Sequence, residues 1–323
     1  MTEPLIDILM ATYNGERFIA EQIESIRRQT YKNWCLLVSD DCSTDGTLDV
    51  VRRYAAEDGR IRIVSEGVKH GGAKENFFSL MTFSDSPYCM FCDQDDVWLP
   101  DKIKDCLEAM SCLEMRHAGG VPLLVFCDMK VVDSNLNIIH ASFEDACNYD
   151  TRRVAFKYLL AQNVAAGCSI LLNRAAIVTN LVIDDCSSIE MHDWWMILIV
   201  SAFGSIGYVD TALSLYRQHD NNELGAGEYA PIKRAKDTTF MLERFRATID
   251  QAVAFREIFG DEISPEDKRC LDFYISAGNT RSLLCALIYL FRSGCWKKGA
   301  RKLGQLIVVA KSAKQKKKTS GGI

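Results

Sequence analysis

Residues 5–46 read LIDILMATYNGERFIAEQIESIRRQTYKNWCLLVSDDCSTDG. Two short apolar runs in this segment, 5–11 and 34–39, are separated by a stretch at 16–29 whose apolar residues recur at the spacing of one helix face. Short strands that alternate with amphipathic helices are typical of βαβ units and of a largely parallel sheet. The segment therefore predicts an α/β fold.

The same alternation continues along the chain. Three more strands are expected at 61–65, 87–92 and 122–132, with helices at 44–57, 73–82 and 99–115. A less regular stretch follows, with a helix at 151–161, a strand at 166–172, a helix at 191–203 and a strand at 206–216. Beyond residue 232 only helices are expected, at 240–259, 265–292 and 295–311. We predict an α/β domain at 1–230 and a helical C-terminal region at 231–323.

The composition excludes several classes of protein. The 323 residues are 48% hydrophobic and 25% charged, which excludes disordered and collagen-like chains. A formal net charge of -5 gives no reason to expect nucleic-acid binding. Thirteen cysteines, an odd number scattered through apolar runs, indicate reduced thiols and a cytoplasmic protein. The longest apolar run, 283–291, is shorter than the roughly 20 residues that a membrane-spanning helix needs.

Positive charge is concentrated at the C-terminal end. No acidic residue follows Asp272, whereas eleven lysines and arginines do, and setting these against the total of -5 leaves -16 on the first 272 residues. Two short apolar stretches, 283–291 and 306–310, alternate with these cations. Apolar surface beside cationic surface suits peripheral contact with the inner face of the cell membrane. The alternative is a packed helical appendage or a dimer interface with a solubilising lysine-rich end.

Polar residues cluster where three of the expected strands end, at 12–15 (TYNG), 39–47 (SDDCSTDGT) and 93–98 (DQDDVW). Ligands of open α/β sheets bind outside the carboxyl ends of the strands. Three carboxylates within 93–96 repel one another unless a cation or an exposed turn absorbs the charge. Hard oxygen ligands suit Mg²⁺ or Mn²⁺ bridging to a diphosphate, whereas a solvated acidic loop is the plainer alternative.

These three motifs resemble the N-terminal signatures of the family 2 inverting glycosyltransferases, and their order and spacing agree over residues 5–220. Within that family the chain resembles bacterial rhamnosyltransferase-like enzymes of cell-surface polysaccharide synthesis, through 163–168 (NVAAGC), 192–195 (HDWW) and 216–222 (YRQHDNN). The resemblance implies a GT-A fold, the nucleotide-diphospho-sugar transferase fold, with a mostly parallel central sheet flanked by helices and a helical C-terminal region.

The resemblance also implies a donor site. The residues expected to bind the nucleotide and the substrate are Thr12, Tyr13, Asn14, Glu16, Asp40, Asp41, Gly71, Asn76, Asp93, Gln94, Trp194 and Arg217. Among them Asp40 is expected to accept the imide N–H of the base, Asp93 to touch the ribose and Arg217 to neutralise diphosphate charge. The residues expected to hold a divalent cation, Mg²⁺ or Mn²⁺, are Asp95, Asp96 and His219. An exposed polar loop is the alternative for Arg217 and His219.

Inverting transfer needs one base to take the proton of the acceptor hydroxyl. By resemblance that base is Asp193, with Glu190 in reserve, although an Asp at that place also suits a plain helix cap. Trp194 and its neighbour Trp195 are candidates for stacking on a sugar or for the core. His192 is open to reading as a structural histidine.

The expected function is metal-dependent transfer of a sugar, L-rhamnose from dTDP-rhamnose, to a glycan or lipid-linked acceptor in the synthesis of the bacterial cell envelope. A UDP-hexose donor and a catalytically silent nucleotide-sugar-binding scaffold are the alternatives. A nucleotidyltransferase is disfavoured because the chain lacks a Gly-rich phosphate loop near its N-terminus.

Overall fold

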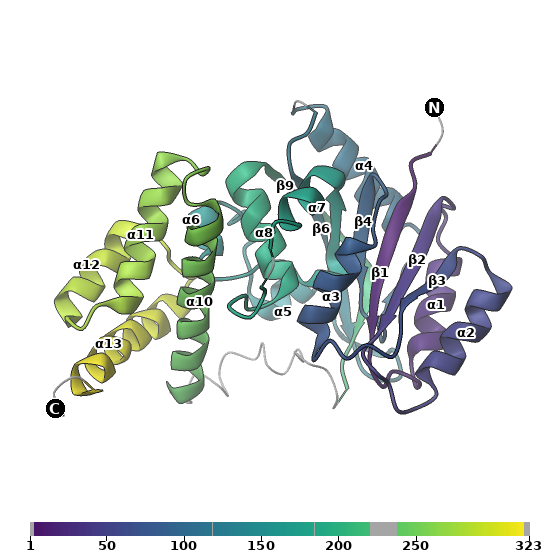
Figure 1. Ribbon diagram of the computed structural model, residues 1–323, viewed down its shortest axis with the longest axis horizontal. Coiled ribbons are helices and arrows are strands. Elements are labelled where there is room, and N and C mark those ends of the chain that lie inside the picture. Colours follow the sequence, from purple (N-terminus) through teal and green to yellow (C-terminus); the bar gives the residue numbers. More distant parts are fainter. Residues whose placement is uncertain (1–2, 118, 184, 220–237, 320–323) are drawn as a thin grey trace.

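The computed structural model describes residues 3–117, 119–183, 185–219 and 238–319, whose strands form one nine-stranded sheet (Figure 1). The first four long strands are mutually parallel, in the order β3-β2-β1-β4. They are β1 (Ile6–Thr12), β2 (Trp34–Asp40), β3 (Ile61–Ser65) and β4 (Tyr88–Cys92). Each lies within two residues of its predicted range. Because they run the same way, their carboxyl ends and the polar motifs that follow them meet at one edge.

The helix predicted at 73–82 is confirmed at both ends, and the other three connecting helices begin three residues later than predicted but end close to the expected residues. They are α1 (Ile19–Arg27), α2 (Thr47–Glu57), α3 (Ala73–Thr82) and α4 (Lys102–Glu114). Each turn that precedes them is held by side-chain to backbone hydrogen bonds rather than by helix. The residues between the end of each strand and the start of the next helix therefore form ordered loops at the edge of the sheet, where a ligand could bind.

The rest of the sheet is mixed. β8 (Ile170–Asn173) runs antiparallel between β4 and β6 (Leu123–Val132), and β6 pairs in parallel with β9 (Ser205–Arg217). Two short strands complete it, β5 (Val97–Trp98) against β9 and β7 (Ile138–His140) against β6. Strands of two or three residues are too short to carry a hydrophobic period, which is why the sequence predicts neither β5 nor β7.

Short helices fill the connections of this second half. They are α5 (Phe143–Cys147), α6 (Phe156–Leu159), the 3-10 turn η1 (Gly167–Ser169), α7 (Arg174–Asn180) and α8 (His192–Phe203). The helix expected at 151–161 is thus only four residues long, and the strand expected at 166–172 begins with a turn. The helix expected at 191–203 is confirmed, and it brings 192–195 to the same edge as the strand ends.

The C-terminal region is helical, with α10 (Thr238–Phe259), α11 (Pro265–Asn279), α12 (Leu283–Ser293) and α13 (Arg301–Thr319). The single helix expected at 265–292 is broken because Thr280 is extended and the side chain of Ser282 caps α12 by accepting a hydrogen bond from the backbone N–H of Cys285. Within these described residues no helix is both long and apolar enough to cross a bilayer.

The C-terminal helices share a hydrophobic core with the α/β part. Figure 1 shows them grouped beside α6 and α8, on the side away from β1 to β3. Trp195 of α8 packs against Phe255 and Phe259 of α10, with ring centroids 5.4 and 6.3 Å apart. α8 is therefore buried between the sheet and α10, which fixes the position of its N-terminus. The predicted boundary at residue 230 lies outside the described residues, so the division into 1–230 and 231–323 stays a prediction.

Candidate active site

A pocket of about 450 Å³ opens at the carboxyl ends of β1 and β4, beside the N-terminus of α8. That volume lies in the range of ligand sites in proteins. Nine of the predicted site residues line it: Thr12, Tyr13, Asp41, Gly71, Asn76, Asp93, Gln94, Asp95 and Asp193. Its other lining residues are Ala11, Lys69, Gly72, Ala73, Phe77, Ala166, Gly167, Met191, His192 and Tyr216. Most of the residues expected from three separate motifs therefore lie around one cavity.

Two predicted nucleotide contacts instead hold the loops at the pocket edge. The side-chain oxygen of Asn14 accepts a hydrogen bond from the backbone N–H of Thr44 at 2.8 Å. Glu16 accepts one from the backbone N–H of Gly46 at 3.0 Å. Neither side chain lines the pocket. Asn14 and Glu16 thus tie the loop after β1 to the loop after β2, and so position the residues that do line it.

Gln94 holds Tyr13 at the rim. Its amide oxygen accepts from the backbone N–H of Tyr13 at 3.0 Å, and its amide nitrogen donates to the carbonyl of Tyr13 at 2.8 Å. The Tyr13 ring remains 56% exposed and lines the pocket. A Cβ on Gly15 would lie 2.1 Å from the Gln94 amide oxygen, so this close approach requires glycine. An exposed aromatic ring on a backbone held in this way suits stacking with a planar ligand.

The structure places Asp41 on the pocket wall and Asp40 behind it. Asp40 is fully buried, and its carboxylate accepts hydrogen bonds from the hydroxyls of Thr12 (2.8 Å) and Ser43 (2.6 Å) and from the backbone N–H of Ser43. The Asp41 carboxylate accepts from the backbone N–H groups of His70 (2.5 Å) and Gly71 (3.1 Å) and lines the pocket. Of the two carboxylates, Asp41 lines the pocket and Asp40, the residue expected to contact a base, does not.

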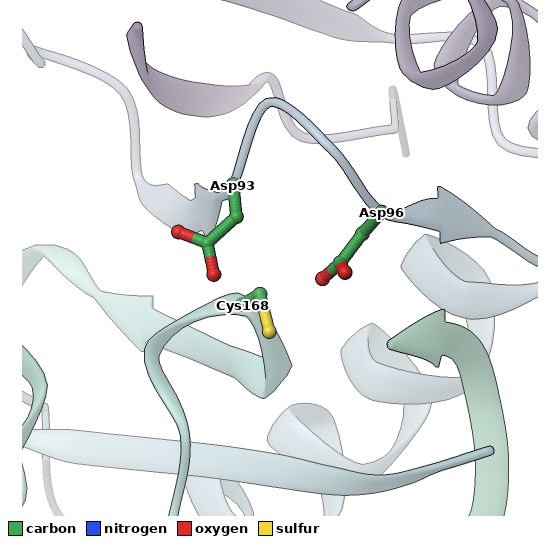
Figure 2. Close-up of side chains that lie close together, drawn as sticks. All are labelled: Asp93, Asp96 and Cys168. Carbon is green, nitrogen blue, oxygen red and sulfur yellow. The ribbon is translucent and has the colours of Figure 1, made fainter. Parts of the chain in front are cut away.

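The buried residues Asp96 and Cys168 form an acidic cluster with Asp93, which is half-buried and lines the pocket, and their potential ligand atoms all lie within 4.8 Å of one another. Figure 2 shows both carboxylates, on the loop that follows β4, pointing toward Cys168. Burial, and then repulsion from Asp95, raises the pKa of Asp96 to about 7. Burial, and then the charges of Asp96 and Asp95, raises the pKa of Asp93 well above its usual range.

Asp96 also belongs to the hydrogen-bonded interior. One of its oxygens accepts from the backbone N–H of Arg217 at 3.0 Å, and the other is buried with no hydrogen-bond partner among the described residues. The buried ammonium of Lys102 donates to the carbonyl of Cys168 at 2.6 Å and to the hydroxyl of Ser214 at 3.1 Å. The charge of Lys102 acts to lower the pKa of Asp96. The ammonium of Lys102 therefore supplies positive charge next to the cluster.

Asp95, which lines the pocket, meets His219, which does not line it. The Nε2 atom of His219 lies 2.7 Å from an Asp95 carboxylate oxygen, and the His219 ring stacks on Phe18 with centroids 4.9 Å apart. Asp95 lines the pocket, whereas Asp96 does not. Two of the three predicted metal ligands are therefore adjacent, although they are 124 residues apart in sequence. The rest of the motif at 216–222 lies outside the described residues from residue 220 onward.

Arg217 is a buried support rather than a pocket residue. Its side chain donates to the carbonyls of Asp95 (2.7 Å) and Ser134 (2.9 Å) and to the Glu21 carboxylate (2.5 Å). It is 1% exposed and does not line the pocket, so the expected contact with a diphosphate is not supported. By binding the carbonyl of Asp95, the guanidinium fixes the loop that carries the pocket carboxylates.

Asp193 lies in the first turn of α8 and lines the pocket. The N-cap residue is Met191, so Asp193 does not occupy the cap position considered as its alternative role. One carboxylate oxygen accepts from the backbone N–H of Trp194 at 2.5 Å. Burial raises the pKa of Asp193 to about 7, against the opposing effect of backbone hydrogen bonds from Trp194 and Gly167. A carboxylate that titrates near neutrality is suited to general-base chemistry.

The neighbours of Asp193 have other roles. Glu190 forms an ion pair with Arg244 of α10 and does not line the pocket. The indole N–H of Trp194 donates to the carbonyl of Leu159 at 2.6 Å, and both Trp194 and Trp195 are packed in the core. The alternative that Trp194 stacks on a sugar is therefore not supported, because its ring faces the interior.

Several pocket residues carry no signal in the sequence. Lys69 lies in the loop after β3, a strand whose end has no polar motif, and Phe77 is an ordinary apolar residue of α3. Gly167 and Tyr216 also line the pocket and lie within the motifs at 163–168 and 216–222. These motifs carry the family resemblance, but they assign no role in the site to either residue. Gly167 and Tyr216 join the site because β8 enters the sheet between β4 and β6, and β9 pairs with β6.

Comparison with known proteins agrees with this geometry. The family described as Glycosyl transferase family 2 matches residues 7–177. The dTDP-rhamnosyl transferase RfbG of Shigella flexneri is 29% identical over 228 residues, covering 67% of this chain and 74% of RfbG. A glycosyltransferase of Haemophilus influenzae is 36% identical over 247 residues, covering 72% of this chain and 71% of that protein.

The fold is also similar to solved structures. The mannosyltransferase PcManGT from Pyrobaculum calidifontis, solved in complex with GDP-Man and Mn²⁺, superimposes with a TM-score of 0.56 at 15% identity. The similarity covers 98% of this chain and 87% of PcManGT. The expected GT-A fold is confirmed by this likeness and by the family match. The chain belongs to glycosyl transferase family 2 and is a glycosyltransferase.

Proposed function

We propose that the pocket binds a nucleoside-diphosphate sugar and that the protein transfers this sugar to a hydroxyl of a glycan or lipid-linked acceptor in cell-surface polysaccharide synthesis. The observation that carries the proposal is that Asp193, with a pKa of about 7, lines the same pocket as Asp93 and Asp95. L-Rhamnose carried by dTDP is the proposed donor, supported by the likeness to RfbG. A UDP-hexose is the alternative donor.

In the proposed reaction, the acceptor hydroxyl oxygen forms a bond to the anomeric carbon of the donor sugar. The bond from that carbon to the diphosphate oxygen breaks at the opposite face, and the nucleoside diphosphate leaves with the electron pair. The Asp193 carboxylate takes the hydroxyl proton. Tyr13 is proposed to stack on the base and Asp41 to accept its N–H, while Thr12, Gly71, Asn76 and Asp93 line the remainder of the nucleotide site.

The residues at the pocket fit a divalent cation, Mg²⁺ or Mn²⁺. Asp95 is proposed to hold it together with His219, since their ligand atoms are 2.7 Å apart and Asp95 reaches the pocket. Asp96 is proposed to have a structural role instead of binding the metal, because its carboxylate accepts a hydrogen bond from the backbone N–H of Arg217 and lies near the charge of Lys102. A bound cation supplies positive charge that stabilises the leaving diphosphate.

Ligand-induced stabilisation tests this function. We expect dTDP, UDP and GDP and their sugars to raise the melting temperature in a Mn²⁺-dependent way, with dTDP-rhamnose giving the largest increase, because a ligand that binds only the folded protein stabilises it. Turnover should release nucleoside diphosphate rather than free pyrophosphate. A larger increase in melting temperature with a UDP-sugar would identify that sugar nucleotide as the donor. No increase with any nucleotide would favour the alternative of a catalytically silent scaffold.

The outer C-terminal helices support the further proposal of contact with an anionic membrane surface. α12 exposes Leu284 (68%), Ile288 and Phe291 (66%) at the spacing of one helix face, and α13 exposes Leu303 and Ile307. Exposed cations lie on and beside these helices: Arg281, Arg292, Lys302, Lys311 and Lys314. Apolar side chains inserted among headgroups, with cations facing anionic lipid, describe a peripheral membrane contact.

Replacing Leu284 and Phe291 together by aspartate is expected to abolish sedimentation with vesicles that contain phosphatidylglycerol, since it places two negative charges on the apolar face. Met115, an exposed apolar residue next to α4, provides the control, and Met115→Asp should sediment as the unchanged protein does. Equal sedimentation with neutral phosphatidylcholine vesicles would contradict the charge argument. Failure of the unchanged protein to sediment would favour the packed-appendage alternative.

A further inference from the structure

His192 occupies an unusual place at the start of α8. Its side chain is only 4% exposed, yet it lines the pocket. The ring stacks on Phe77 of α3 with centroids 4.0 Å apart, and the ring of Phe91 in β4 meets it edge-on at 4.8 Å. Two aromatic rings from different elements therefore fix the plane of the imidazole, so its nitrogens have defined directions.

Both ring nitrogens of His192 are buried, and neither has a hydrogen-bond partner among the described residues. Burial lowers the pKa of His192 to about 3, so the ring is neutral at physiological pH. A neutral imidazole offers one N–H donor and one acceptor nitrogen. Buried polar groups are nearly always hydrogen-bonded in folded proteins, so a group left unpaired at a pocket wall calls for a ligand.

Gly167 packs closely against one of these nitrogens. A Cβ at this position would lie 2.9 Å from Nε2 of His192 and 3.5 Å from Cβ of Asp193. A side chain at residue 167 would thus press on His192 and touch Asp193. Gly167 also lines the pocket, so the backbone that packs against Nε2 is itself part of the pocket wall.

The surroundings of His192 indicate which part of a ligand it meets. It directly precedes Asp193, the proposed base, and its ring contacts Phe91, which lies two residues before Asp93 at the end of β4. The sugar to be transferred has to lie between the base and the carboxylates at that strand end, because its anomeric carbon is joined to the diphosphate on one side and attacked from the other.

We propose that His192 binds the donor sugar, with its neutral imidazole hydrogen-bonded to a hydroxyl of the sugar that is transferred. The inference rests on the proposed function and adds a residue that contacts the sugar of the donor and not its nucleotide. A hydroxyl group both donates and accepts, so either tautomer of the ring provides a partner for it. His192 binds and orients the sugar and takes no proton from the acceptor.

His192→Phe tests the proposal, because phenylalanine keeps the stacking on Phe77 and removes both ring nitrogens. Binding is measured by calorimetry with Mn²⁺ present, using dTDP-rhamnose against dTDP and UDP-glucose against UDP. The comparison uses whichever of these two pairs the unchanged protein binds. We expect the His192→Phe variant to bind the sugar nucleotide about tenfold more weakly than the unchanged protein does, a loss of about 1.4 kcal/mol, and to bind the nucleoside diphosphate with unchanged affinity. His192→Gln should recover part of the loss.

Trp195→Phe is the matched control. Trp195 lies on the same helix, and its indole N–H is also buried without a partner, but its ring packs against α10 and does not line the pocket. Its substitution should leave both affinities unchanged. Equal weakening of sugar nucleotide and nucleoside diphosphate by His192→Phe, or no weakening of either, would overturn the proposal.

Spectra of ¹⁵N-histidine-labelled protein provide a readout that needs no folded variant. The sugar nucleotide should shift the ring nitrogens of His192, whereas the nucleoside diphosphate alone should leave them in place. The reverse pattern overturns the assignment to the sugar. Failure of the unchanged protein to bind any nucleotide would overturn the proposed function itself, and that outcome is distinct from a protein that binds nucleotide sugars without using His192.

Discussion

Asp193→Asn is expected to lower the rate of sugar transfer by about 10²- to 10⁴-fold, the usual contribution of general acid–base catalysis, while donor binding persists. Asparagine has the same shape and can still accept the hydrogen bond from the backbone N–H of Trp194. It cannot take the proton of the acceptor hydroxyl. Single-turnover transfer measures the rate, and calorimetry with the donor measures binding.

Glu190→Gln provides the control for that substitution. Glu190 lies three residues earlier and pairs with Arg244 rather than lining the pocket, so its loss should cost stability more than catalysis. If Glu190→Gln abolishes transfer and Asp193→Asn does not, the base is Glu190. If both remain fully active, the pocket assigned here is not the catalytic one.

The dependence of the rate on pH follows from the same carboxyl group. A general base has to be ionised, and burial raises the pKa of Asp193 to about 7. The rate should therefore fall as pH drops below about 7, by about tenfold for each further unit, and this limb should vanish in Asp193→Asn. A pH profile of transfer at saturating donor checks the limb.

The stability of the folded protein should change with pH in the opposite direction to the rate, because ionised Asp193 is needed for catalysis but destabilises the fold. Since the folded protein holds the proton more tightly than the unfolded chain, ionising Asp193 destabilises the fold as pH rises from its ordinary pKa of 3.8 toward 7. Asp193→Asn removes that cost and should unfold at a higher urea concentration than the unchanged protein at pH 8. The base is thus held in its reactive state at the expense of stability.

Much of the fold follows from hydrophobic period, and the limits of prediction are local. β1 to β4 are seven or five residues long and alternate with helices, so their order and direction are predictable. At the end of β2, pattern alone does not decide which of Asp40 and Asp41 faces the pocket. The pairing of β2 with β3 shifts register between Val38 and Ser39, and Cys42 has a φ of 61°. Such irregularities decide where each side chain points.

Arg217 and Trp194 illustrate a second limit. Both stand in motifs rich in functional residue types, and both are buried by partners distant in sequence: Glu21 and Ser134 for Arg217, and Leu159 for Trp194. A motif identifies the segment that lies near a site. Which of its side chains faces the cavity depends on contacts that form only when β9 and α8 are packed, and no local pattern contains that information.

Asp95→Asn is expected to abolish Mn²⁺-dependent donor binding and to lower transfer by at least about 10²-fold, because it removes the ligand charge that a cation on the diphosphate requires. Asparagine preserves the shape of the side chain, and the carbonyl of residue 95 still accepts from Arg217. Calorimetry of the donor with and without Mn²⁺ separates loss of the metal from loss of the nucleotide site, since metal-free binding should be unchanged.

Asp96→Asn and Cys168→Ser decide between the two places proposed for this cation among the described residues. Both residues belong to the acidic cluster with Asp93 (Figure 2), and neither lines the pocket. If Asp95 and His219 hold the cation, both variants keep Mn²⁺-dependent binding. If the cluster with Asp93 holds it, Asp96→Asn loses that binding, and Cys168→Ser shifts the preference from Mn²⁺ toward Mg²⁺, because a hydroxyl is a harder ligand than a thiolate. Each place reaches the pocket through one carboxylate, Asp95 in the first and Asp93 in the second, so the binding of Mn²⁺ by these variants decides between them.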